Sequence, residues 1–186
     1  MNIAVLASHG GSNLQAIIDG CKSGKIGGRV CVVISNNGGS MALKRAANEG
    51  IPAFHISKAT APDFEELLLK TLQTHGSDIV FLAGYLKKVP TNVLEAYKGK
   101  IYNIHPSLLP KYGGKGMFGI NVHAAVLAAG ETETGVTIHR VTAEYDEGDI
   151  LAQKKVRVLA DDTPEALAAR VLEQEHGLLA EFLAEL

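Results

Sequence analysis

The chain has 186 residues, of which 46% are hydrophobic and 20% are charged, with a formal net charge of −2. This composition suits a globular domain with a sizeable core and excludes the strongly basic surface typical of nucleic-acid binding. No apolar run approaches the roughly 18 residues that span a bilayer, so we expect no membrane partner. The opening MNIAVLAS lacks a signal peptide's basic region, and Cys21 and Cys31 are too few for a disulfide framework. We therefore expect a reduced, cytoplasmic protein.

Short apolar strands alternate with helices up to residue 105. The expected strands are Ile3–Ser8, Arg29–Ser35, Pro52–Ser57, Asp78–Gly84 and Ile101–His105. The expected helices between them are Asn13–Lys22, Met41–Gly50 with Gly50 as C-cap, Pro62–Gln73 and Pro90–Tyr97. Strands joined by right-handed crossovers pair in parallel, so this pattern predicts a doubly wound, mostly parallel α/β sheet covered on both faces.

The last third of the chain has a different pattern. A short helix over Asn121–Ala129 precedes two segments of alternating polarity, 134–141 and 150–158, which predict an antiparallel strand pair at the edge of the sheet. Thr163 and Pro164 then open a final helix with one apolar stripe, formed by Leu167, Val171, Leu172, Leu178, Leu179, Phe182 and Leu183. No repeat or Pro/Gly/Ser-rich linker divides the chain, so we expect a single domain over residues 1–186.

The segment SHGGSN, Ser8 to Asn13, joins the first strand to its helix. Its glycines allow close backbone approach to a ligand, and the helix N-terminus after them favours an anion. The segment is neither GxGxxG nor a P-loop, which favours a monophosphate over a dinucleotide or ATP. The alternative is a tight turn in which Ser12 is a plain N-cap.

Asn103 and His105 lie two residues apart at the carboxyl end of a strand, so their side chains project from the same face. Ligands of open α/β sheets bind at this edge, where an amide and an imidazole can stabilise an oxyanion. The alternative is a satisfied core histidine beside a turn-forming asparagine. His123 and His139 are candidates to join His105 around a metal, but no metal-binding spacing supports them, and we expect no metal.

Carboxylates supply two further candidates. The segment Thr142–Asp149 holds Glu144, Asp146, Glu147 and Asp149. A carboxylate among them can orient His105, and the alternative is a solvated acidic turn. Glu175, beside Gln174, falls within the apolar stripe of the last helix. A carboxylate there needs backbone N–H groups or a polar ligand, unless the stripe edge reaches solvent.

Six motifs run through nearly the whole chain: GSNLQAII, SNN, LAGYLKKV, NIHPSLLPKY, TGVTIHRVTAEYDEGDIL and VLEQEH. With them the chain resembles the phosphoribosylglycinamide formyltransferases, also called glycinamide ribonucleotide transformylases, of the formyltetrahydrofolate-dependent formyltransferase superfamily. The resemblance implies formyl transfer from 10-formyltetrahydrofolate to the amine of glycinamide ribonucleotide in purine biosynthesis. It also implies that neither ATP nor a metal is needed, that the partners are small molecules, and that the protein is a monomer or homodimer.

The resemblance also implies roles for individual residues. It matches Asn103, His105 and Asp146 to the catalytic trio, in which protonated His105 and Asn103 stabilise the oxyanion and Asp146 favours the charged histidine. The implied ribonucleotide site, largely in the N-terminal half, comprises Gly11, Ser12, Asn13 and Glu175. The implied folate site, largely in the C-terminal half, comprises Leu86, Lys87, Lys88, Val89, Asn103, Val141 and Asp146.

Some residues depart from the family pattern. Ala61 stands near the position where family members carry an arginine for the folate's glutamate tail. Lys87 and Lys88 are candidates to supply that charge instead, although Lys88 fits a solvated surface lysine better. The glycine-rich segment Gly113–His123 is longer than usual and predicts a mobile lid over the folate side. His9 has no assigned role.

Three rival functions fit less well. Methionyl-tRNA formyltransferases resemble this chain followed by a further C-terminal domain, and formyltetrahydrofolate deformylases carry an extra N-terminal one. A receiver-like signalling module would carry clustered acids after the first strand, where Ser8 and His9 stand.

Overall fold

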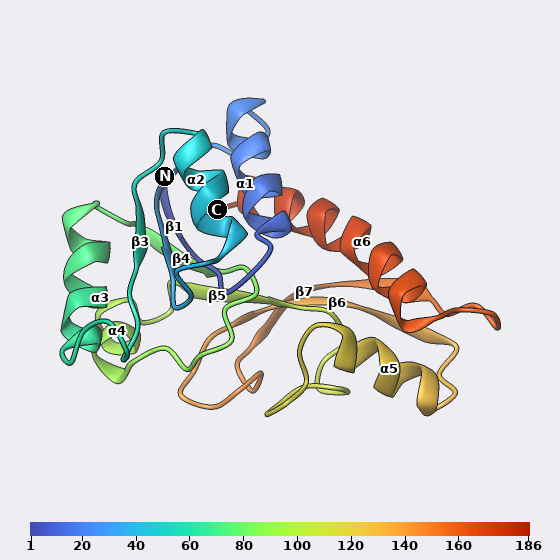
Figure 1. Cartoon of the computed structure of the whole chain (residues 1–186). Helices are drawn as coiled ribbons and strands as arrows, with labels where there is room; N and C mark the ends of the chain where they lie inside the picture. The colour runs from blue at the N-terminus through green and yellow to red at the C-terminus, as the bar shows by residue number, and fades with distance from the viewer.

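The computed structural model describes all 186 residues as one sheet with helices packed on it (Figure 1). Seven strands form the sheet in the order β3-β2-β1-β4-β5-β6-β7. The strands are β1 Asn2–Leu6, β2 Arg29–Ser35, β3 Ala53–His55, β4 Ile79–Leu82, β5 Ile101–His105, β6 Glu133–Arg140 and β7 Ile150–Arg157. The helices are α1 Ser12–Lys22, α2 Met41–Asn48, α3 Phe64–Thr74, α4 Thr91–Ala96, α5 Ile120–Ala128 and α6 Pro164–Ala184.

The strand directions confirm the predicted α/β architecture. Strands β1 to β5 pair in parallel, whereas β5–β6 and β6–β7 pair in antiparallel fashion. The order runs outward from β1 on one side and from β4 on the other, so the topological switch point lies between these two strands. Ligands of such sheets bind beyond the carboxyl ends of the strands at this point.

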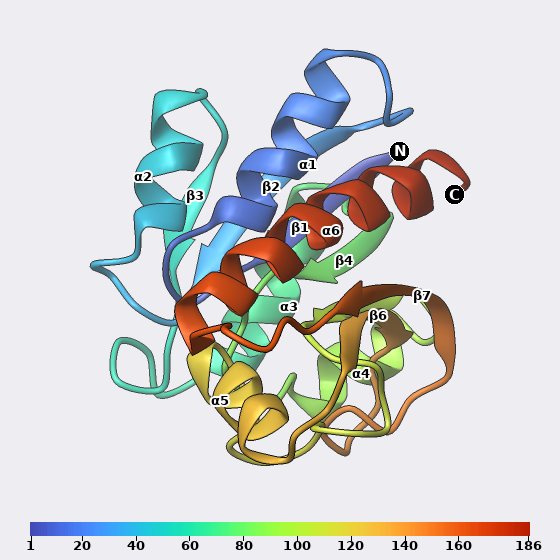
Figure 2. The same ribbon diagram turned by 90° about the vertical axis from the view of Figure 1, so that its right-hand side faces the viewer.

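The core has one apolar layer on each face of the sheet, as alternating side chains require. Ile3 and Val5 of β1 belong to the layer that includes α1, α2 and α6, while Ala4 and Leu6 belong to the layer that includes α3 and α4. Figures 1 and 2 show the two groups of helices on opposite faces, with α6 running across the sheet beside α1. A smaller cluster joins Val126 of α5 and Val156 of β7 to Leu167 and Val171 of α6. The last helix therefore fastens the antiparallel edge to the rest of the fold.

Helix ends agree with the sequence to within a few residues. Thr163 caps α6 as expected, because its hydroxyl accepts the Ala166 N–H at 3.2 Å. Gly50 lies one residue beyond the α2 cap, Glu49, since the left-handed backbone follows the last helical turn. Helix α3 begins at Phe64, two residues after the expected Pro62.

None of the six helices combines the length and the apolar character needed to cross a bilayer.

Candidate active site

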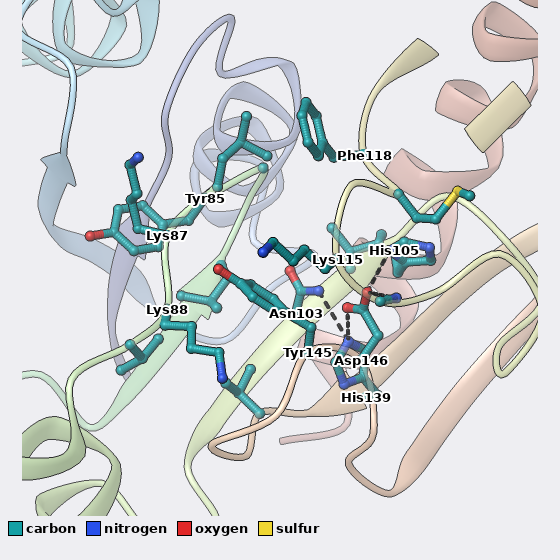
Figure 3. Close-up of a pocket in the computed structure, with 18 of the residues that line it drawn as sticks. Tyr85, Lys87, Lys88, Asn103, His105, Lys115, Phe118, His139, Tyr145 and Asp146 are labelled. Atoms are coloured by element: carbon teal, nitrogen blue, oxygen red, sulfur yellow. Dashed lines mark hydrogen bonds and ion pairs between the residues drawn. The ribbon is translucent and has the colours of Figure 1, made fainter. Parts of the chain in front are cut away.

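Two adjoining cavities open at the carboxyl edge of the sheet. The larger, of about 490 Å³, is walled by the segment after β4, the end of β5, residues Gly114–Gly119 and the loop after β6 (Figure 3). The smaller, of about 340 Å³, is walled by the loop His9–Asn13 and the start of α5. The two share a wall made of Asn13, Gly84, Leu86, Phe118, Gly119 and Glu175.

The expected site residues line these two cavities, and Asn13, Leu86 and Glu175 line both. Gly11, Ser12, Asn13 and Glu175 line the smaller cavity. Leu86, Lys87, Lys88, Val89, Asn103, His105, Val141 and Asp146 line the larger one. Residues that are distant in the sequence therefore lie together at these cavities, whereas Ala61 lines neither of them.

The loop between β1 and α1 depends on Gly11. Its φ of 69° is left-handed, and a Cβ there would lie 2.9 Å from Ala42 Cα, so only glycine fits. Gly11, rather than Ser12, is the N-cap of α1, and no side chain caps the helix. The N-terminus of α1 thus keeps backbone donors without a side-chain acceptor at the smaller cavity.

Helix α2 holds the same loop through Arg45, which the sequence did not single out. Arg45 Nε donates to the Gly10 carbonyl at 2.9 Å, and its Nη1 donates to Gln15 Oε1 at 3.2 Å. The carbonyl of His9 accepts from Ser40 Oγ at 3.2 Å and from the Ala42 N–H at 3.1 Å. The His9 backbone thus anchors the loop, while its exposed side chain borders the smaller cavity.

Glu175 is buried on the inward face of α6, as the apolar stripe predicted, and lies at the wall between the cavities. We expected backbone N–H groups or a polar ligand as its partner, but within the protein its partner is a side-chain amide, because Asn13 Nδ2 donates to Glu175 Oε2 at 2.6 Å. Burial raises the pKa of Glu175 to about 7, against the opposing effect of the Asn13 hydrogen bond. The Asn13 Oδ1 atom is buried without a partner. This pair therefore retains an unused acceptor.

His105 is held from both sides of its ring. Its Nε2 lies 2.7 Å from the Tyr112 carbonyl, which can only accept, so Nε2 carries a proton. Its Nδ1 lies 3.7 Å from Asp146 Oδ2, beyond ordinary hydrogen-bond length. Burial lowers the pKa of His105 and outweighs the raising effects of Asp146 and of the Tyr112 carbonyl. Burial therefore favours the neutral imidazole, in which Nδ1 is the bare nitrogen.

Asp146 is the acid that reaches the histidines. Burial raises the pKa of Asp146, but the neighbouring His139 and His105 side chains and the Gly114 N–H together hold it below its usual value. Glu144 instead pairs with Lys88 at 3.1 Å, Asp149 pairs with Arg140 at 3.3 Å, and Glu147 is exposed and lines neither cavity. Of the four acids, only Asp146 can thus act on His105 as a fixed negative charge.

His139 is a member of the site that the sequence considered only as a metal ligand. Its Nδ1 lies 2.8 Å from the Arg140 carbonyl and therefore carries a proton. Its Nε2 then faces Asn103 Nδ2 at 3.0 Å and Asp146 Oδ1 at 3.4 Å (Figure 3). Strand register explains the meeting, since Asn103 of β5 pairs directly with His139 of β6. His139 thereby orients the Asn103 amide.

Lysines line the open side of the larger cavity. Lys88 Nζ lies 3.1 Å from Glu144 and 5.2 Å from the centre of the Tyr145 ring, so its charge is already engaged. Lys87 and Lys115 also line this cavity, and neither forms an ion pair (Figure 3). The cavity therefore offers cations to an anionic ligand at its mouth.

The segment Gly113–His123 lines both cavities, whereas we expected it to cover the folate side alone. Residues Gly114–Gly119 line the larger cavity, and Phe118–Asn121 line the smaller one. From Ile120 the segment is helical, and it places His123 inside α5, buried and with Nδ1 unpartnered. No group of three or more His, Cys, Asp or Glu side chains is arranged to hold a metal ion.

Comparisons with known proteins agree with this architecture. The family model described as "Formyl transferase" matches residues 1–183. The chain is 46% identical over 96% of its length to a chloroplastic phosphoribosylglycinamide formyltransferase of Arabidopsis thaliana, and 42% identical over 96% to a phosphoribosylglycinamide formyltransferase of Escherichia coli. It superposes with a TM-score of 0.92 on glycinamide ribonucleotide transformylase 1 from Symbiobacterium toebii, at 42% identity, covering 100% of this chain and 88% of the other.

The extent of these matches differs between relatives. The chain spans 63% of the length of the Arabidopsis relative and 83% of that of the Escherichia coli relative. The family model, however, covers all but the last three residues of the chain. From its sequence, its fold and the side chains gathered at its cavities, the chain belongs to the formyl transferase family.

Proposed function

We propose that the chain transfers the formyl group of 10-formyltetrahydrofolate to the amine of glycinamide ribonucleotide in purine biosynthesis. The products are N-formylglycinamide ribonucleotide and tetrahydrofolate. The observation that carries the proposal is the meeting of two cavities, one at a glycine loop and helix N-terminus and one walled by Asn103, His105 and Asp146. The names of the relatives support the same activity.

Each cavity suits one substrate. The smaller cavity offers the N-terminus of α1 to a phosphate and the Asn13–Glu175 pair to the polar groups of a ribonucleotide. The larger cavity has the volume and the apolar wall of a site for a drug-sized ligand, with Leu86, Val89 and Val141 beside Asn103. Lysines at its mouth suit the carboxylates of a folate. The shared wall brings the amine of one substrate next to the formyl group of the other.

Asn103 and His105 act where charge develops. The amine attacks the formyl carbon, and the carbonyl electrons move to oxygen to form an oxyanion. Asn103 Nδ2, held by His139, donates to that oxygen. Because Nε2–H of His105 donates to the Tyr112 carbonyl, Nδ1 is the ring nitrogen that is left to act on the substrates.

The same nitrogen carries the proton. The amine releases one proton as it becomes an amide, and Nδ1 of His105 accepts it. The imidazolium is then a second donor to the oxyanion, stabilised by Asp146 and the Tyr112 carbonyl. When the bond to the folate nitrogen breaks, this proton returns to that nitrogen. No ATP enters this sequence of steps.

A substrate assay tests the proposal. The purified chain should convert glycinamide ribonucleotide and 10-formyltetrahydrofolate to products without added ATP, as measured by folate absorbance and by mass spectrometry of the ribonucleotide. Methionyl-tRNA as acceptor, and water in the absence of any acceptor, provide the two comparison reactions. Activity with tRNA or water alone would contradict the proposal.

We infer further that residues 1–186 act as one formyltransferase domain, in the cytoplasm, as a monomer or homodimer that binds neither nucleic acid nor membrane. The free thiols of Cys21 and Cys31 support a reducing compartment. Three plant relatives are named as chloroplastic, so imaging of the tagged protein in its own cells is the direct test of location. Analytical ultracentrifugation tests the state of assembly.

A further inference from the structure

Two residues with unusual backbone geometry hold the same imidazole. Tyr112, at φ 57°, and Asp146, at φ 58°, are the only non-glycine residues with a left-handed backbone. The Tyr112 carbonyl accepts from Nε2 of His105, and the Asp146 carboxylate lies beside Nδ1. Both groups that contact the ring therefore come from residues in a backbone conformation that non-glycine residues rarely adopt.

The conformation of Asp146 has a local explanation, whereas that of Tyr112 does not. Short polar residues such as aspartate tolerate the left-handed region, but a bulky tyrosine needs support from its surroundings. That support comes from Glu131, in the turn between α5 and β6. Tyr112 Oη donates to Glu131 Oε1 at 3.0 Å, and Lys111 Nζ lies 2.8 Å from the same oxygen.

A second contact holds the backbone turn at Lys111 and Tyr112 from its buried side. Ser107 Oγ, which is fully buried, donates to the Lys111 carbonyl at 2.6 Å. The turn is thus fixed at Lys111 and at the Tyr112 side chain, and the Tyr112 carbonyl between them points at His105. The hydrogen bond between Tyr112 and Glu131, called the anchor below, lies outside both cavities, since neither residue lines them.

We propose that Glu131 and Tyr112 are positioning residues, which keep the single proton of neutral His105 on Nε2 and so leave Nδ1 free to accept a proton. This inference rests on the proposed formyl transfer. Neither side chain touches the substrates. The hydrogen bond to Glu131 holds the Tyr112 side chain and so keeps the Tyr112 carbonyl in place. That carbonyl accepts from Nε2–H of His105 and so favours the Nε2–H tautomer.

The anchor matters because the Asp146 carboxylate and the Tyr112 carbonyl compete for the single proton of His105. The Asp146 carboxylate lies 3.7 Å from Nδ1, and a small rotation of the ring would let Nδ1–H donate to it. That tautomer would place the proton on the nitrogen that must accept one, and would turn the bare nitrogen towards Tyr112. The Tyr112 carbonyl opposes this change only while its 2.7 Å contact with Nε2 is held.

Glu131→Ala and the matched Glu131→Gln test the proposal. Glutamine keeps an oxygen that can accept from Tyr112, so it should retain kcat within about threefold, while alanine should lower kcat about tenfold or more with KM values unchanged. Glu133→Ala removes an exposed ion pair with Lys155, 2.8 Å long and remote from both cavities, and controls for the loss of a surface charge. Equal kcat for wild type and Glu131→Ala would overturn the inference.

Nitrogen NMR of His105 gives a readout that does not depend on activity. The ¹⁵N shifts at pH 7.5 should show Nε2 protonated in the wild type and in Glu131→Gln, and a mixture of tautomers in Glu131→Ala. If the wild type transfers no formyl group, the proposed function fails, while this measurement still decides the positioning role. An unchanged Nε2–H tautomer in Glu131→Ala would overturn it.

Two changes at Tyr112 separate positioning from simple stability. Tyr112→Phe removes only the hydroxyl and should reproduce the tautomer mixture and the loss of kcat. Tyr112→Gly removes the anchor but relieves the left-handed strain, so its thermal midpoint should not fall with its activity. A kcat that follows the thermal midpoint across all these variants would show a structural role only and would contradict the proposal.

Discussion

Asn13 Nδ2 donates a 2.6 Å hydrogen bond to Glu175 Oε2, joining the first turn of α1 to the middle of α6 across 162 positions of sequence. The pair stands in the wall between the cavities, so Asn13 and Glu175 each border both of them. Because Glu175 is buried and has a single hydrogen-bonding side-chain partner, its charge is poorly solvated. Its titration therefore affects the stability of the fold.

We predict that Glu175→Gln flattens the pH dependence of stability. The pKa of Glu175 is 4.5 when unperturbed and about 7 when folded, so the folded state binds more protons between these values and stability falls as pH rises through them. The full shift corresponds to about 3 kcal/mol, most of which is lost between pH 5 and pH 7.5. Urea unfolding of wild type and variant at pH 5 and pH 7.5 measures it.

The control for that experiment is Glu173→Gln, which removes the same charge from an exposed position on the same helix. It should keep the wild-type dependence on pH. The titrations of the buried histidines are common to all three proteins and cancel in the comparison. Parallel stability curves for wild type and Glu175→Gln would refute the prediction.

His105→Ala should abolish formyl transfer and leave the fold intact. The ring lies at the rim of β5, and its loss removes both a proton acceptor and an oxyanion donor, so we expect a fall in kcat of about 10³-fold or more. Initial rates and circular dichroism on the same samples measure activity and folding. His75→Ala, at the end of α3 and outside both cavities, should retain wild-type turnover. Near-normal turnover by His105→Ala would overturn the mechanism.

Asp146→Asn should lower both the rate and the pKa of His105. The substitution removes the negative charge that raises that pKa, while asparagine still accepts the left-handed backbone. NMR titration of the His105 ring should show a lower midpoint than in the wild type, with kcat reduced by about 10- to 100-fold. An unshifted midpoint would show that the two side chains are not coupled.

Lys87→Met should weaken folate binding more than Lys88→Met does. Lys88 already pairs with Glu144, so its removal frees that carboxylate, whereas Lys87 has no acidic partner. We expect KM for the folate to rise about twofold to fivefold for Lys87→Met, corresponding to an exposed charge pair of up to about 1 kcal/mol. The effect should shrink in high salt and leave KM for the ribonucleotide unchanged. A larger effect of Lys88→Met would assign the role to the other lysine.

The parallel part of the sheet was predictable because each of its strands is a continuous apolar run and each crossover is a helix with its own periodicity. Asn103 and His105 could be placed on one face from strand geometry alone, and Glu175 could be placed inward from the stripe of α6. These conclusions need only the spacing of apolar and polar residues within one helix or strand, which can be read directly from the sequence.

The partners of those residues were not predictable in the same way. Strand β6 runs antiparallel to β5, so its carboxyl end lies at the opposite edge of the sheet, and the following loop must fold back to bring Asp146 to His105. The meeting of His139 with Asn103 depends on the register of that pairing, which alternation does not fix. Arg45 and Tyr112 act through backbone carbonyls, for which the sequence has no signal.

The two free edges of the sheet resist unwanted pairing by different means. Strand β3 has only three residues and offers little backbone to a neighbouring molecule, while β7 has eight residues but carries Lys154, Lys155 and Arg157 along its length. Two molecules that approached by their β7 edges would bring these cations together. A single charge-removing substitution on β7 would therefore favour aggregation more than a comparable change on β3, although neither touches the cavities.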